Sequence, residues 1–273
     1  MNKQINKQMK QIKKEEHKLL NQKENVFVKS TINPVVDKIQ GYIPGKLKST
    51  LETAFYKGFW LVFKKGNIYI EKTYNRDKIQ LEYDLNNYAI DKSSSRKYIN
   101  RLDRYANQSQ MMNSSISVIE GGVLGLFGIG LPDIPLFLSL IMKGIYEIAL
   151  SYGYSYDTDE EKEYILLVIG GAMTKGERQK EWNCRIDGLG DNIDNNIITD
   201  IDLEEQMKAT ASILSDALLT AKFIQGIPFV GAVGGIVNYN IIRKISRFAA
   251  IKYKKRYYIK KQKESSGKLT SFF

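Results

Sequence analysis

Hydrophobic residues recur at three- and four-residue spacing along most of the chain, which is the pattern of amphipathic helices. The clearest stripe starts near Lys46 and repeats up to Gly66. Similar spacing predicts charged helices over residues 76–89 and 95–112 and a more apolar helix over residues 203–224. Residues 67–74 alternate locally like a strand, but no second strand follows, so we expect helix or loop there. The predicted fold class is therefore an all-α, multi-helix domain.

Two apolar, glycine-rich stretches, residues 120–142 and 223–242, interrupt this pattern. Both are nearly free of charge, and glycine and proline fragment both, which is unusual for a membrane span and for an ordinary core helix. We expect two glycine-rich apolar helical hairpins whose helices approach closely through small residues. The packing glycines are Gly121 with Gly125 and Gly231 with Gly235. An alternative to protein packing is that the tip of the first hairpin, with Phe127 and Leu131, dips into one membrane leaflet.

Local signals place several helix boundaries. Asp133 is a candidate N-cap for a helix that ends at Gly153. Thr158 and Glu161 form a capping-box pattern that starts the next helix. Residues 175–200 are polar and contain glycine, so we expect a long surface loop there.

Composition limits the class of protein. The 273 residues are 43% hydrophobic, enough for a substantial core, and the single cysteine excludes an intramolecular disulfide. A formal net charge of +11 favours anionic partners, either lipid headgroups or nucleic acid. The polar N-terminus has no apolar signal region, so a cytoplasmic protein is expected. We divide the chain into a basic helical arm (1–25), a helical domain (26–258) and a basic, frayed tail (259–273).

Residues 251–263 carry seven basic residues and three tyrosines without one acid. This composition is typical of an interfacial anchor, in which each Lys or Arg near an anionic leaflet contributes about 1 kcal/mol. A solvated helix end is an equally simple interpretation, and single-stranded nucleic acid is a less favoured one because no RNP, KH or helix-turn-helix signature accompanies the segment. The predicted lipid-binding residues are Lys252, Lys254, Lys255, Arg256, Tyr257, Tyr258, Lys260 and Lys261.

Catalytic chemistry has little support in the sequence. The one histidine, His17, lies in the charged arm, so a Ser-His or Cys-His mechanism has no base in the core, and Cys184 is expected to be an ordinary thiol. No phosphate-binding glycine motif and no metal-ligand spacing occur, so we expect no metal and no cofactor. Glu120 and Asp133, the only acids in the first glycine-rich stretch, are the remaining catalytic candidates.

Four stretches of this chain resemble the EcsC protein family of bacteria. They are GGVLGLFGIGLPDIP (121–135), EIALSYGY (147–154), KFIQGIPFVGAVGGIVN (222–238) and AIKYKKR (250–256). The resemblance extends over about residues 46–258 and leaves the N-terminal arm unaccounted for. It implies a poorly characterised protein whose family is named after an operon that also encodes an ABC transporter, and it supplies no catalytic motif.

Together these observations predict a membrane-associated accessory protein at the cytoplasmic, inner face of the cell membrane. Its expected partners are the anionic membrane surface and a membrane transporter, with a link to transport or protein secretion. The first alternative is a carboxylate-dependent hydrolase, and the second is a nucleic-acid binder.

Overall fold

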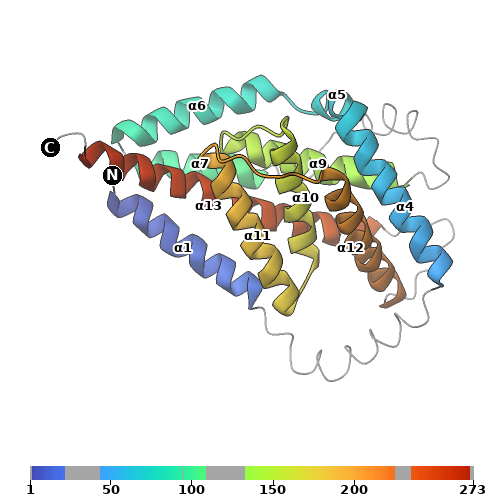
Figure 1. Ribbon diagram of the computed structural model, residues 1–273. Coiled ribbons are helices and arrows are strands. Elements are labelled where there is room, and N and C mark those ends of the chain that lie inside the picture. The colour runs from blue at the N-terminus through green and yellow to red at the C-terminus, as the bar shows by residue number, and fades with distance from the viewer. Residues whose placement is uncertain (1, 22–43, 94, 109–132, 225–234, 271–273) are drawn as a thin grey trace.

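The computed structural model describes residues 2–21, 44–93, 95–108, 133–224 and 235–270, and all regular structure in these ranges is helical (Figure 1). The helices are α1 (Asn2–Leu20), α4 (Gly45–Leu61), a π-helical turn (Val62–Gly66), α5 (Asn67–Glu71), α6 (Arg76–Ser93), α7 (Arg96–Gln108), α9 (Asp133–Ser151), α10 (Asp159–Met173), α11 (Gly176–Asp194), α12 (Leu203–Ile224) and α13 (Gly235–Thr270). The predicted all-α class is confirmed. The helical interpretation of residues 67–74 holds for α5, which follows the π-helical turn.

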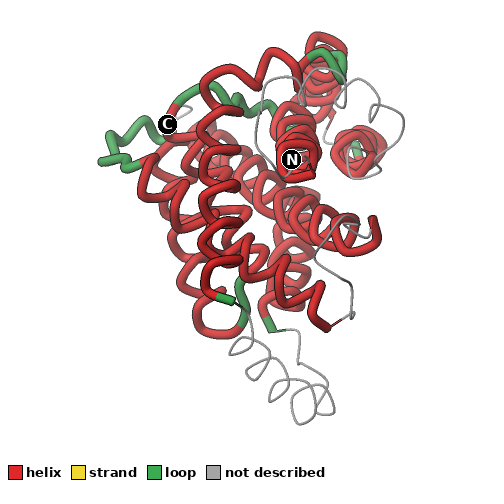
Figure 2. The backbone as a smooth tube through the Cα atoms, turned by 90° about the vertical axis from the view of Figure 1, so that its right-hand side faces the viewer, coloured by secondary structure: helices red, strands yellow, loops and turns green. Residues whose placement is uncertain are grey.

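Helices α9 and α13 lie side by side at the centre of the assembly (Figure 1). The view turned by 90° shows helices joined by short loops throughout the described residues (Figure 2). On one side, α10 packs between α11, α12 and α13, and α12 also packs against α4. On the other side, α6 and α7 pack on α9 and on each other. Helix α1 packs on α13 and touches α11. Each described helix therefore contacts α9 or α13, either directly or through one neighbouring helix.

Within the described residues, Ile134–Ser151 of α9 is the one window long and apolar enough to cross a membrane by length and composition. Inside the protein, 78% of that window is buried, because α4, α6, α7 and α13 surround it. A central core helix satisfies the same test, so burial accounts for this composition.

The predicted helix boundaries around α9 and α10 agree with the structure. Helix α9 begins at Asp133, and Gly153, with φ of +79°, follows its last turn. Thr158 is the N-cap of α10, and its hydroxyl accepts a hydrogen bond from the backbone N–H of Glu161 at 3.3 Å. These short-range signals act within one turn, which is why sequence alone reveals them.

The expected long loop over residues 175–200 is wrong, since most of it forms α11. Trp182, Ile186 and Leu189 recur at helical spacing and are buried, although polar residues surround them in the sequence. A close contact between α10 and α11 occurs at Gly170, which is not one of the predicted packing glycines. A methyl group at Gly170 of α10 would lie 2.1 Å from the Trp182 ring of α11.

The two ends of the chain are parts of the helical assembly. Ile5, Met9 and Ile12 of α1 are buried against the body, so the arm is not a free extension. Helix α13 continues to Thr270, and Lys261 within the expected tail is buried. The prediction of a frayed tail from residue 259 is therefore wrong as far as residue 270.

Candidate functional site: the basic helices α1 and α13

The basic segment 251–263 lies on α13, and most of its side chains are buried rather than exposed. Lys252, Arg256 and Lys261 are only 1%, 5% and 4% exposed. Tyr257 and Tyr258 are buried as well, whereas Lys254 and Lys255 are partly buried and Lys260 is exposed. The prediction that this segment is an exposed basic anchor is wrong for the buried residues. The physical reason is that acids on five other helices converge on α13.

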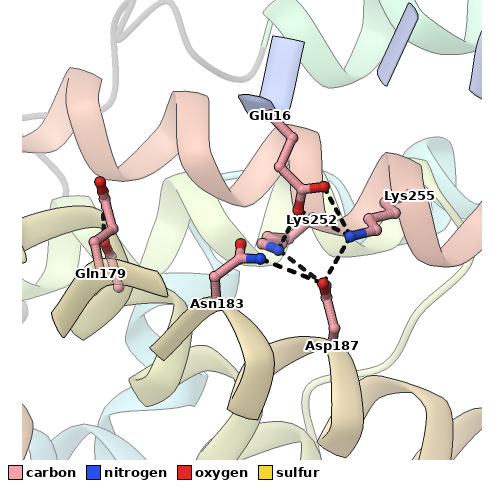
Figure 3. Close-up of polar contacts among 7 residues, drawn as sticks. Glu16, Gln179, Asn183, Asp187, Lys252 and Lys255 are labelled. Atoms are coloured by element: carbon pink, nitrogen blue, oxygen red, sulfur yellow. Dashed lines mark hydrogen bonds and ion pairs between the residues drawn. The ribbon is translucent and has the colours of Figure 1, made fainter. Parts of the chain in front are cut away.

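A neutral cluster of two lysines and two carboxylates joins α1, α11 and α13 (Figure 3). Lys252 Nζ donates to Glu16 of α1 and, at 2.9 Å, to Asp187 Oδ1 of α11. Lys255 Nζ donates to Glu16 Oε2 at 2.8 Å and to Asp187 Oδ2 at 2.7 Å. Burial alone would lower the pKa of Lys255, but hydrogen bonds to both acids reverse this and raise it. The cluster fixes α1 with its inner face on α13.

Arg256 occupies a second, deeper cluster. Its guanidinium forms a bidentate pair with Glu161 at 2.9 and 3.0 Å and a second pair with Asp194 at 2.7 and 3.2 Å. The rings of Tyr154 and Tyr164 lie 4.2 and 4.4 Å from the guanidinium carbon, within cation–π range. Burial raises the pKa of Glu161 above the ordinary range, and Arg256 acts in the opposite direction. This charge is satisfied inside the protein and is not available to a ligand.

Three further lysines of α13 pair with acids of neighbouring helices. Lys254 Nζ lies 2.7 Å from Asp103 of α7, Lys261 Nζ lies 2.8 Å from Asp91 of α6, and Lys263 Nζ lies 2.7 Å from Asp191 of α11. Among the described contacts, Lys260 is the one basic residue of the segment that has no acid partner. Residues 251–263 therefore hold the helices together through ion pairs and offer little free charge.

A row of unpaired positive charge lies on the outer face of α1. Five exposed lysines follow one another there at spacings of four, three, four and four residues, and within the described part of the chain none forms an ion pair. We call Lys3, Lys7, Lys10, Lys14 and Lys18 the α1 lysine face. At 100° per residue, their mean direction is about 170° from that of the buried stripe of Ile5, Met9 and Ile12. This face was not among the predicted sites, although the regular lysine spacing opposite the apolar stripe is visible in the sequence.

The α1 lysine face is about 22 Å long, at 1.5 Å per residue. Part of it lines a shallow depression formed by Lys3, Gln4, Asn6, Lys7 and Lys10. A row of unpaired ammonium groups on a rigid helix attracts anionic surfaces and does not by itself perform a reaction.

Comparison with known proteins identifies the family. The EcsC protein family matches residues 6–258 of this chain. The chain belongs to the EcsC protein family. Protein EcsC of Bacillus subtilis (strain 168) is 24% identical over 164 residues, which cover 58% of this chain and 64% of that protein. The matched region thus spans less than two thirds of that relative, and no solved structure matches this chain.

The EcsC family match begins at residue 6, inside α1, and ends at residue 258, inside α13. The N-terminal arm is therefore mostly within the family match, contrary to the expectation that the resemblance starts near residue 46. The match includes both the Glu16 cluster and the Arg256 cluster, together with four of the five residues of the α1 lysine face.

Several predicted site residues of this EcsC-family chain cannot be placed. Glu120, Gly121, Gly125, Phe127, Leu131 and Gly231 lie outside the described residues. Asp133 and Gly235 are the first residues of α9 and α13. Their proposed roles in catalysis, close packing and lipid contact stay predictions.

Within the described ranges, no group of three or more His, Cys, Asp or Glu side chains is arranged to hold a metal ion. Cys184 is exposed on α11, and His17 is exposed on α1. The carboxylates of the two clusters described above are all engaged with Lys or Arg side chains.

Proposed function

We propose that this EcsC-family protein is a non-enzymatic accessory protein at the cytoplasmic face of the cell membrane, held peripherally to anionic lipid by the α1 lysine face. The supporting observation is that these five lysines are exposed, share one helix face and have no acid partner in the described residues. A role as accessory to a membrane transporter is part of the proposal and rests on the family resemblance.

The physical basis is the attraction between unpaired ammonium groups and a negatively charged leaflet. Each Lys near such a surface contributes about 1 kcal/mol, and the contribution falls off within a Debye length of about 8 Å at physiological salt. Binding through α1 alone should therefore be reversible and strongly salt-dependent. The lysines of α13 add little, because their charges are already compensated inside the protein.

The test is sedimentation of the full chain with vesicles of 70% phosphatidylcholine and 30% phosphatidylserine at several salt concentrations. Replacing Lys7, Lys10 and Lys14 with Gln removes about 3 kcal/mol, so the apparent affinity should fall about 150-fold. These side chains point away from the body, so circular dichroism should show an unchanged fold.

A matched control replaces Lys57, Lys64 and Lys65 with Gln. These lysines are also exposed, and the variant changes the net charge by the same amount. The proposal expects the control to bind vesicles within about threefold of the unmodified protein. Equal loss in both variants would mean that only net charge matters and would overturn it. Loss of binding to a single-stranded oligonucleotide, with vesicle binding unchanged, would instead assign the α1 lysine face to nucleic acid.

A further inference from the structure

Helix α6 lies on the outside of the assembly (Figure 1), and it carries an exposed apolar stripe. Leu81, Leu85 and Tyr88 are 58%, 59% and 65% exposed. Lys78 and Lys92 stand at the two ends of the stripe and are exposed as well. We call these five residues the α6 seam. Large exposed apolar side chains that are contiguous on one element mark interaction sites, whereas isolated ones do not.

The α6 seam faces away from the protein's own core. Asn86 and Ile90 are buried, and Ile79 and Tyr83 pack partly against the core from the same side of α6. At 100° per residue, the mean direction of these four residues is about 150° from that of the seam. No described helix covers the seam, so its apolar surface stands open to solvent.

The spacing of the seam indicates the shape of what binds it. Its members recur at intervals of three, four, three and four residues, the repeat with which two helices pack side by side over several turns. From this repeat we infer that the α6 seam binds an amphipathic helix of another protein, whose apolar stripe is bounded by an acid at each end. The acids would face Lys78 and Lys92, and because a lysine stands at each end, the partner helix can run in either direction.

A second copy of this chain is a poor fit to the seam. In a parallel pair, Lys78 would face Lys78 of the other copy, and Asp77 would approach Glu82 of the other copy. In an antiparallel pair centred on Leu85, Lys78 would face Lys92 of the other copy. Like charges at seam positions oppose pairing in both directions, so the charge pattern selects a different partner.

The membrane surface proposed for α1 also cannot occupy the seam at the same time. Lys255 of α13 contacts α1 through Glu16, and Tyr257 of α13 contacts α6 through Asn87. Residues two apart project about 160° from each other around a helix, so α1 and α6 lie on opposite sides of α13. Figure 1 shows the same arrangement. A flat bilayer against α1 would leave the seam free for a protein.

The experiment uses two fluorescein-labelled, 18-residue synthetic helices and the full chain without lipid. Both peptides carry leucines at the same 3-4 spacing, and they differ only at the two ends of that stripe, where one has Glu and the other has Lys. Fluorescence anisotropy at 0.15 M salt should show about tenfold tighter binding of the Glu peptide, because two attractive contacts replace two repulsive ones. The charge reversal Lys78→Glu with Lys92→Glu should invert this preference.

Replacing Leu85 and Tyr88 with Ser should abolish binding of the Glu peptide. The matched control replaces Ile197 and Ile198 with Ser. These two residues are also exposed and apolar but lie on the α11–α12 connection, so binding of the Glu peptide should be unchanged. Equal binding of both peptides would overturn the inference. The inference would also be overturned if the full chain dimerised or bound vesicles, and if the variant with Ser at positions 85 and 88 lost that dimerisation or vesicle binding. The peptide assay contains no lipid, so its outcome is independent of whether α1 binds vesicles.

Discussion

Replacing Arg256 tests whether the charges of α13 serve the interior of the protein. The variant Arg256→Met keeps an unbranched side chain of similar length and removes the guanidinium. Four hydrogen bonds disappear, and Glu161 and Asp194 lose the cation that both of them share. Glu161, which is 5% exposed, is then buried without a counter-charge, and the partly buried Asp194 also loses its cation.

The expected cost follows from this burial. Removing one partner of a buried ion pair typically costs about 3–5 kcal/mol, because the remaining charge is uncompensated. The lost contacts with the rings of Tyr154 and Tyr164 add about 1 kcal/mol. The expected destabilisation of about 4–6 kcal/mol is a large share of the total stability of an ordinary domain. An exposed arginine would cost less than about 1 kcal/mol.

Urea unfolding followed by circular dichroism measures this loss, and two controls separate charge from packing. The triple variant Arg256→Met with Glu161→Gln and Asp194→Asn removes all three charges and should recover most of the lost stability. Lowering the pH should also help the single variant. Burial already raises the pKa of Glu161, and loss of Arg256 raises it further, so the neutral acid is favoured in the folded state. Stability should therefore increase as the pH falls from 7 towards the ordinary Glu pKa of about 4.5.

The reasoning would be refuted if Arg256→Met cost less than about 1 kcal/mol at pH 7, which is the range of an exposed ion pair. A triple variant no more stable than the single variant would show that packing, and not charge, causes the loss. The first result would restore residues 251–263 as a candidate exposed surface.

Two further predictions concern packing and titration. Gly170→Ala should destabilise the protein by about 1–2 kcal/mol, because the new methyl group overlaps the Trp182 ring. Gly188→Ala, with open space around it on α11, should stabilise the protein by up to about 1 kcal/mol. Thermal unfolding of both variants measures these changes, and equal shifts in melting temperature would contradict the close α10–α11 contact. Burial raises the pKa of Tyr83 to about 12 and that of Tyr146 well above its usual value. The stability that these two tyrosines contribute should therefore be constant well below pH 10 and fall above it, and part of the phenolate absorbance at 295 nm should appear only on unfolding; ionisation of all tyrosines in the folded protein near pH 10 would contradict this.

Much of the fold follows from local pattern. The stripe that starts near Lys46 predicts α4, residues 203–224 coincide with α12, and the Thr158 capping box marks the start of α10. Helix α11 was missed because its buried stripe includes polar side chains such as Gln179, whose amide donates to the carbonyl of Gly171. Hydrophobic periodicity does not register a polar residue that is buried with a partner.

The candidate site was harder to predict than the fold, because charge compensation is a long-range property. Nothing near residue 256 in the sequence shows that Glu161 lies against it, and nothing near residue 252 points to Glu16, which is 236 residues away. The seven basic residues of 251–263 therefore resemble a free positive patch in the sequence, although six of them are paired with acids in the structure. The unpaired lysines of α1 looked ordinary because two acids, Glu15 and Glu16, interrupt them in the sequence.

Glu16 also determines which face of α1 can contact a membrane. It lies on the same side of the helix as Ile5, Met9 and Ile12, and it is buried there against Lys252 and Lys255. If α1 left α13 and turned this side towards lipid, the carboxylate would lose two cations and enter or border hydrocarbon, which is costly for a charged group. The inner face of α1 is thus specific for α13, and only its outer face is suited to an anionic surface. Membrane binding through α1 should leave the helix docked, so Glu16→Gln, which weakens the docking, should reduce vesicle affinity rather than increase it.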